Sequence, residues 1–280
     1  MCSTSSSKPL VSVITPVFNG ERFIQRVVNS VSQQNFSVQH IIVDDCSTDD
    51  SWNLLESLTT KFPWLKPIRL NKNSGPVLAR NEAIKNASGR YIAFLDVDDF
   101  WLPGKLSTQI SFMEENNCGI SFTDYRFVSE NGAFIGPRIK GFNSIGDHLH
   151  HMTRYLGCLT IVIDREKYPN FLIPDISPAY RAEDFLAWRD YMLQVGEPAL
   201  RCPHDLARYS VVQNSRSSKP LRAAKSVWLL YRDVERLSLL KSLFYFSCYL
   251  AFSFLKRKIY KPQLKREKVD SGDIAWSIIK

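Results

Sequence analysis

The chain has 280 residues, of which 44% are apolar and 23% are charged, as in an ordinary globular protein with a sizeable core. Its six cysteines are scattered and form no C-x-x-C pair, which argues against a zinc or redox motif. The first residues lack the layout of a signal peptide. These observations indicate a cytoplasmic protein with reduced thiols.

The formal net charge of +8 is unevenly distributed along the chain. Residues 214–280 hold 15 Lys and Arg against 5 acidic residues, whereas the rest of the chain is nearly neutral. A basic C-terminal segment suggests an anionic partner, either lipid headgroups or nucleic acid. On charge alone, a solvated basic surface is the favoured interpretation of this segment.

The first 116 residues alternate between apolar runs typical of strands and segments with apolar residues at helical spacing. Strands are predicted over residues 10–15, 40–45, 66–70 and 91–95. Pro16 is expected to end the first strand. Helices are predicted over residues 21–32, 47–61, 76–87 and 103–116. Ser47 or Thr48 can cap the second helix, with Asp49 and Asp50 in its first turn.

The remainder of the chain is less regular. Residues 119–128 resemble a strand, and the Asn131–Gly132 pair after it predicts a hairpin. Further strands are predicted over residues 157–164 and 206–212. A helix is expected over residues 182–196, ended by Gly196, and a long amphipathic helix over residues 221–240.

The alternation up to about residue 128 predicts an α/β fold with a mostly parallel sheet and helices on both faces. Without internal repeats or a long linker, one compact unit with a C-terminal helical extension is expected. Ligands of such sheets bind at the carboxyl ends of the strands. Five carboxylates should converge at that edge: Asp44, Asp45, Asp96, Asp98 and Asp99.

A cluster of like charges at the end of a buried strand needs a counter-charge. Mg²⁺ and Mn²⁺ prefer oxygen ligands, often one or two carboxylates together with substrate phosphates. Such an ion would bridge and neutralise a diphosphate. The alternative is that these aspartates are helix caps and salt-bridge partners.

Five sequence segments occur in an order that resembles family-2 glycosyltransferases with the Rossmann-like GT-A fold: VSVITPVFNGERFI, IIVDDCSTDDS, NKNSGPVLARNEAI, GRYIAFLDVDDFW and AEDFLAW. The segments GCLTIVID, YSVVQNSRSS and AAKSVWLLYRDVERL resemble bacterial enzymes of cell-surface polysaccharide assembly, including a teichuronic-acid type. The resemblance implies a catalytic domain over residues 1–215. Its nucleotide-sugar half would span about 8–128 and its acceptor half about 129–215. Residues 216–280 would form basic amphipathic helices that associate with a membrane.

The resemblance also implies a nucleotide-sugar donor, most often a UDP-sugar, and inversion at the anomeric carbon. Pro16, Phe18 and Glu21 would shape the first donor loop, with Phe18 beside the base. Asp45 would accept a hydrogen bond from the uracil imide. The stretch that flanks base, ribose and phosphate corresponds to Asn73, Gly75 and Arg80.

Metal binding is implied for the DVDD segment. Asp98 would be the direct ligand of Mn²⁺ or Mg²⁺, Asp96 would face the ribose or the metal, and Asp99 would support the loop or make a structural ion pair. Related enzymes often carry a His after a Tyr-Arg pair in a later strand. This chain has Gln213 near that place, so no third metal ligand is predicted.

An inverting transfer needs a general base that takes the proton of the attacking acceptor hydroxyl. The resemblance assigns this role to Asp184, which with Glu183 begins a predicted helix whose dipole favours carboxylates. Trp188 lies four residues after Asp184, hence on the same helix face, and would form a platform for the acceptor. Glu183 is also assigned to acceptor binding. Helix capping by the two carboxylates and core packing of Trp188 are the alternatives.

Residues 243–255 form a charge-free aromatic run that is too short to span a bilayer, which takes about twenty apolar residues. Lys256, Arg257 and Lys258 follow it, a pattern that fits a helix lying in an anionic membrane interface. Packing of this helix on the protein or across a dimer is the alternative.

The sequence thus predicts a metal-dependent inverting glycosyltransferase with a glycan or lipid-linked acceptor. It would be peripheral on the inner face of the cell membrane. A haloacid-dehalogenase-like phosphoryl-transfer enzyme and a non-catalytic nucleotide-sugar-binding protein are the alternatives. No nucleic-acid-binding module is recognised. The oligomeric state is not predicted.

Overall fold

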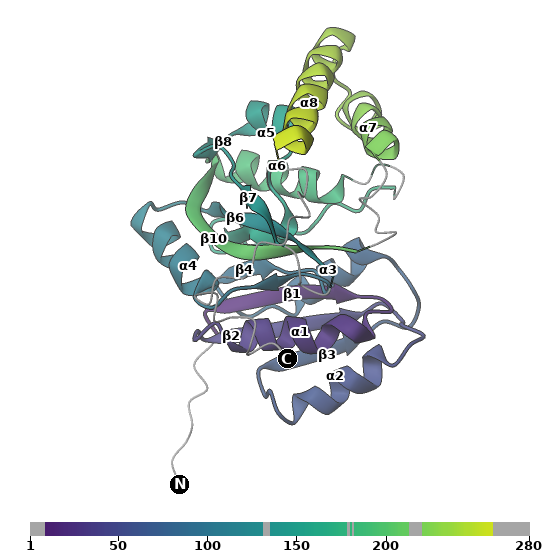
Figure 1. Cartoon of the computed structure of the whole chain (residues 1–280), viewed down its shortest axis with the longest axis vertical. Helices are drawn as coiled ribbons and strands as arrows, with labels where there is room; N and C mark the ends of the chain where they lie inside the picture. Colours follow the sequence, from purple (N-terminus) through teal and green to yellow (C-terminus); the bar gives the residue numbers. More distant parts are fainter. Residues whose placement is uncertain (1–8, 131–134, 178–179, 181, 213–219, 260–280) are drawn as a thin grey trace.

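The computed structural model describes residues 9–130, 135–177, 180, 182–212 and 220–259 of the chain (Figure 1). Within these residues a ten-stranded mixed sheet forms the centre of the molecule, with helices packed against it. The predicted α/β class is therefore confirmed. The sheet is parallel in its first half and mixed in its second, so it is less parallel than the sequence predicted.

The parallel half contains the first four strands, and they pair in the order β3-β2-β1-β4. Their bounds are β1 Val11–Val17, β2 Val38–Asp44, β3 Leu65–Arg69 and β4 Tyr91–Phe94. Pro16 does not end β1 as predicted, but pairs in register with Val43 of β2. The β4 ladder stops at the level of Ile14, so the missing N–H of Pro16 costs no hydrogen bond on that side.

The mixed half adds the later strands: β5 Phe100–Trp101, β6 Ile120–Ser129, β7 Ile135–Ile139, β8 Ser144–Ile145, β9 Ile161–Asp164 and β10 Ala199–Val211. β9 lies antiparallel between β4 and β6, and β10 runs parallel to β6. The antiparallel β6–β7 pair confirms the predicted hairpin, whose Asn131–Gly132 turn lies outside the described residues. The strand expected over residues 157–164 begins with a 3₁₀ turn, Cys158–Thr160.

Helices cover both faces of the sheet, as predicted. One face carries α1 (Glu21–Ser32), α2 (Ser51–Thr59) and α4 (Lys105–Glu115). The other carries α3 (Pro76–Lys85) and α6 (Glu183–Val195), which ends at Gly196 in the left-handed region. The short helix α5 (Asp147–Thr153) precedes β9.

The start of α2 differs from the prediction because the residues before it bind the neighbouring loop. Asp49 and Asp50 precede the helix, and neither Ser47 nor Thr48 caps it. Instead, the Ser47 hydroxyl accepts the Asn19 N–H, and the Asp49 carboxylate accepts the Glu21 N–H. These bonds fix the turn between β1 and α1 at the carboxyl edge of the sheet.

The prediction of a single amphipathic helix over residues 221–240 is wrong. Helix α7 (Pro220–Leu229) runs into a π-helical segment, Leu230–Val234, and a separate helix α8 (Leu239–Ile259) follows. The break occurs at Arg236, whose φ of 50° lies in the left-handed region. Neither Gly nor Pro marks this break in the sequence.

The C-terminal helices pack on α5 and α6 and share a hydrophobic core with them (Figure 1). The Tyr231 hydroxyl donates to the His151 carbonyl at 2.6 Å, and His148 Nδ1 lies 2.5 Å from the Tyr245 hydroxyl. For the apolar run at residues 243–255, the alternative to membrane binding was packing on the protein. This alternative holds for one side of α8. None of the described helices combines the length and apolarity needed to cross a bilayer.

Candidate active site

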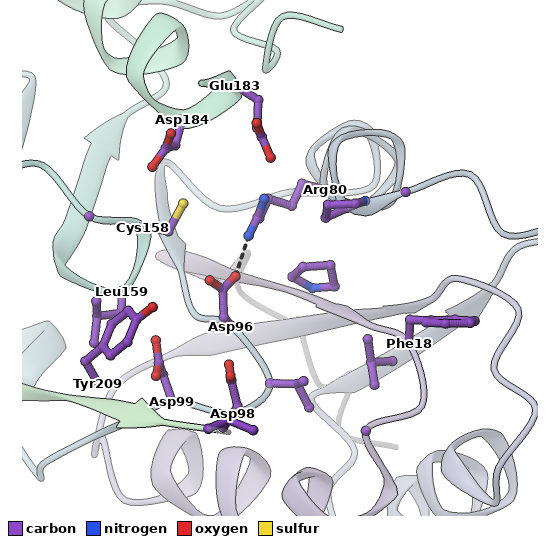
Figure 2. Close-up of a pocket in the computed structure, with 18 of the residues that line it drawn as sticks. Phe18, Arg80, Asp96, Asp98, Asp99, Cys158, Leu159, Glu183, Asp184 and Tyr209 are labelled. Carbon is purple, nitrogen blue, oxygen red and sulfur yellow. Dashed lines mark hydrogen bonds and ion pairs between the residues drawn. The ribbon is translucent and has the colours of Figure 1, made fainter. Parts of the chain in front are cut away.

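A cavity of about 840 Å³ opens at the carboxyl ends of the parallel strands (Figure 2). Its lining comes from the ends of β1, β2 and β4, from the first turns of α3 and α6, and from α7 and α8. This is the edge where an open α/β sheet binds its ligands, and the volume suits a molecule the size of a nucleotide.

One rim of the cavity is a loop held by Asp45. The two oxygens of this buried carboxylate accept the N–H groups of Ser74 at 2.6 Å and Gly75 at 2.7 Å. Gly75 has a φ of 89°, a left-handed conformation that favours glycine, and it precedes α3. Asp45 therefore fixes the Asn73–Gly75 loop, while Phe18 lies half-exposed on the β1 side of the cavity.

The floor of the cavity contains an ion pair between Arg80 of α3 and Asp96, with Nη2 and Oδ1 2.5 Å apart (Figure 2). Burial alone would lower the pKa of Arg80, but the Asp96 carboxylate raises it above its ordinary value. Arg80 is therefore a permanent cation beside the strand-end carboxylates.

The Asp98 and Asp99 carboxylates lie beside Asp96, and within the part of the chain that the structure describes the nearby cation Arg26 makes no ion pair with either of them. Burial, together with the charge on Asp96, raises the pKa of Asp98 to about 6. Burial and both neighbouring carboxylates raise the pKa of Asp99 well above its usual range. Asp99 Oδ1 accepts the Ser210 N–H of β10 at 2.8 Å, so this residue braces the loop, as the sequence indicated.

Arg26 of α1 holds the same loop by its backbone. Its Nη2 donates to the Asp98 carbonyl at 2.5 Å and to the Ser210 hydroxyl at 3.1 Å, and its Nη1 donates to the Glu130 carbonyl at 2.9 Å. Nothing in the sequence pointed to this residue, because one Arg on an amphipathic helix carries no signal of partners in distant segments.

Glu183 and Asp184 face the strand-end carboxylates from the other side of the cavity (Figure 2). Burial raises the pKa of Asp184, and the Arg154 guanidinium, 3.9 Å from Asp184 Oδ1, opposes that rise. Arg154 follows α5 in a left-handed conformation and lies over the Phe185 ring. Its role in the site was likewise not evident from the sequence.

Most of the predicted site residues meet in this cavity: Pro16, Phe18, Asp45, Asn73, Gly75, Arg80, Asp96, Asp98, Glu183 and Asp184. Glu21 does not line it, because its carboxylate accepts the Asp50 N–H and ties the first loop to α2. Trp188 is fully buried against Phe94 and Phe171. The prediction that Trp188 forms an acceptor platform is therefore wrong, and its alternative of core packing holds.

The described residues contain no group of three His, Cys, Asp or Glu side chains arranged to hold a metal. Asp96 and Asp98 nevertheless fit a hard divalent cation. Asp98 is a partly buried carboxylate, and burial together with the neighbouring Asp96 charge raises its pKa. Because Mg²⁺ and Mn²⁺ are often held by one or two carboxylates with substrate phosphates, two protein ligands suffice.

The fold has the architecture of a GT-A glycosyltransferase: a mixed sheet, a cavity at the carboxyl ends of its strands, and a set of carboxylates that line this cavity. A solved structure of Staphylococcus aureus TarS residues 1–349 in complex with UDP superposes with a TM-score of 0.63 at 22% identity. The superposition covers 89% of this chain and 72% of that one, and it confirms the predicted GT-A fold.

The family itself follows from the sequence comparisons. The model of glycosyl transferase family 2 matches residues 12–173, and the chain belongs to this family. It is 38% identical to the putative teichuronic acid biosynthesis glycosyltransferase TuaG of Bacillus subtilis, over 89% of this chain and 98% of that protein. It is 32% identical to the Escherichia coli UDP-Glc:alpha-D-GlcNAc-diphosphoundecaprenol beta-1,3-glucosyltransferase WfgD, over 80% and 86%. These matches leave the dehalogenase-like alternative without support.

Proposed function

We propose that this chain is a metal-dependent, inverting glycosyltransferase that moves a sugar from a UDP-sugar to a lipid-linked acceptor of cell-surface polysaccharide assembly. The observation that carries the proposal is the single cavity in which the Asp96 and Asp98 carboxylates face Asp184 (Figure 2). The donor nucleotide and the acceptor are those in the name of the relative WfgD.

The donor would lie along the rim made by β1 and the Asn73–Gly75 loop. Phe18 offers an aromatic face to the base, and the bonds from Asp45 hold the loop that flanks base and ribose. Arg80 supplies a cation at the floor, where the diphosphate would lie. Asp98 and Asp96 would hold Mn²⁺ or Mg²⁺, which when bound neutralises charge on the leaving diphosphate.

Asp184 would act as the general base. Its carboxylate takes the proton of the acceptor hydroxyl while the hydroxyl oxygen bonds to the anomeric carbon. The bond between that carbon and the diphosphate oxygen breaks, and the nucleoside diphosphate leaves. Attack from the side of Asp184, opposite the diphosphate, inverts the configuration. Glu183 would bind a second acceptor hydroxyl.

Arg154 would keep Asp184 ionised and oriented. Replacing Arg154 with Met removes the cation that opposes the raised pKa of Asp184. The acidic limb of the profile of kcat against pH should then move to higher pH, because the protonated carboxyl cannot accept a proton. Arg154→Lys should restore most of the wild-type profile. An unchanged profile with a higher Kd for UDP would instead place Arg154 on the donor.

The experiment that tests the proposal is a screen of nucleotide sugars with the full chain, with and without Mn²⁺. We expect UDP release that needs the metal and increases when a GlcNAc-diphospholipid acceptor is added. NMR of the product anomer reports inversion or retention. Release of inorganic phosphate, or the absence of turnover with every donor, would contradict the proposal.

The location proposed is the cytoplasmic face of the cell membrane, with the C-terminal helices as the contact. Its support is an exposed apolar side of α8 with the basic residues 256–258 directly after it in the sequence.

A further inference from the structure

Part of the cavity wall is formed by residues other than the donor, metal and base residues described above. It consists of Ala223 and Ser226 from α7, and Tyr249 and Ser253 from α8. The two helices cover the side of the cavity near α5 and α6, on which they pack. They belong to the C-terminal segment that the sequence placed outside the catalytic domain.

The position of this wall indicates which of the two substrates it contacts. Donor loops from β1, β2 and α3 occupy one side of the cavity, and Asp184 lies on the other. An acceptor that attacks opposite the leaving diphosphate must enter from the side of Asp184. There α7 and α8 flank the first turn of α6, with Ala182 and Phe185 in their common core. The wall is therefore adjacent to the place that an acceptor sugar occupies.

Helix α8 presents two different sides. Ser242, Tyr245, Tyr249 and Ser253 recur at helical spacing on the side that meets the protein and the cavity, and Ser242 and Tyr245 are buried. The opposite side is apolar and exposed, with Phe254 66% and Leu240 80% accessible. Its large residues are Leu240, Leu243, Phe244, Leu250, Phe254 and Leu255.

The width of the helix sets the distance between these two sides. An α-helix with its side chains is about 10–12 Å across. A bilayer in contact with the apolar side of α8 would therefore lie within about one helix diameter of the acceptor wall. The basic residues 256–258 continue the same helix, and their charge complements anionic lipid headgroups.

We propose that α7 and α8 form the acceptor subsite, with Tyr249 in contact with the acceptor sugar. A bilayer in contact with the apolar side of α8 would place this subsite near the lipid diphosphate of the acceptor already proposed, and far from the distant end of a long polymer. This inference rests on the proposed function and names the helices and the residue that bind the acceptor at the same site.

The test uses the full chain, a UDP-sugar that it hydrolyses, and two forms of each acceptor. A panel of monosaccharide diphosphates is prepared on undecaprenol in anionic phospholipid vesicles and on a short, water-soluble alkyl chain. Tyr249→Ala should raise the KM for both forms about tenfold, and its effect on metal-dependent donor hydrolysis should be much smaller. Tyr249→Phe keeps the ring and should lie between Tyr249→Ala and wild type.

Phe254→Ser is the matched control on the other side of the same helix. It should raise the KM only for the vesicle-bound form and reduce flotation of the protein with vesicles. An unchanged acceptor KM in Tyr249→Ala would overturn the subsite. A long glycan polymer is added to the same assay as a competing acceptor, and preference for it over every lipid-proximal acceptor would overturn the placement of the subsite near the lipid diphosphate. If the wild type hydrolyses no UDP-sugar, the proposed function itself would be refuted.

Discussion

Replacing Asp184 with Asn is expected to reduce sugar transfer by about 10²- to 10⁴-fold while UDP binding stays nearly unchanged. The amide keeps the size of the carboxylate but cannot accept the proton of the acceptor hydroxyl. Asp184 faces the donor residues from the other side of the cavity, so its loss should not disturb them. Transfer rates and the Kd for UDP, measured on the same preparation, check both parts.

Glu183→Gln is the matched control for this experiment, because Glu183 precedes Asp184 and lines the same cavity. It should change the KM for the acceptor more than the kcat. Should Asp184→Asn transfer sugar at the wild-type rate, or should Glu183→Gln lose more of the kcat, the general base would be a different residue.

Replacing Asp98 with Asn should abolish the metal dependence of donor binding and reduce kcat/KM by about 10²-fold or more. The neutral amide cannot compensate a divalent cation as the carboxylate does. Calorimetric titration of Mn²⁺ in the presence of UDP measures this loss directly. Wild-type metal affinity in Asp98→Asn would exclude Asp98 as a ligand.

The same substitution should stabilise the protein when no metal is present. The pKa of Asp98 in the folded chain is about 6, above the ordinary value of 3.8 for this side chain. The ionised carboxylate therefore destabilises the fold above pH 6, and this cost disappears as the pH falls through 6 toward 4. At pH 7.5, metal-free Asp98→Asn should be more stable than the wild type by about 1–3 kcal/mol.

Thermal unfolding with and without Mn²⁺ and UDP tests the direction of this difference in stability. The wild type should gain stability from the pair of ligands, and Asp98→Asn should gain much less. At pH 4 the metal-free proteins should unfold at nearly the same temperature. A variant less stable than the wild type at pH 7.5 would mean that Asp98 is already compensated by the protein.

The parallel half of the fold was predictable because its information is local. Apolar runs that end in Asp44 and Asp96 alternate with helical spacing, and the carboxyl ends of parallel strands share one edge. The C-terminal half was less predictable. Its strands pair with distant partners, and the break between α7 and α8 occurs at Arg236, whose residue type does not indicate a left-handed conformation.

The candidate site divides in a similar way. The positions of the carboxylates could be predicted because these residues follow strands or begin a helix. The burial of Trp188 could not be predicted. Its spacing places it on the same helix face as Asp184, but the spacing does not tell where the cavity ends and the core begins. The partners of Arg26 and Arg154 are set by tertiary packing, with separations of up to 184 residues for Arg26. Single-sequence patterns do not carry such information.

The bonds of Arg26 have a consequence for protein engineering. This one side chain joins the Asp98 backbone to Glu130 and Ser210, at the ends of β6 and β10. A chimera that joins the donor half of this chain to the acceptor half of a relative would keep a backbone carbonyl at the position of Glu130. It would lose the Ser210 hydroxyl wherever the relative has no hydroxyl there, and the partly buried Arg26 would lose that acceptor. Recombination between family members should therefore exchange α1 together with the end of β10, and a junction near residue 128 should lower stability where the relative lacks that hydroxyl.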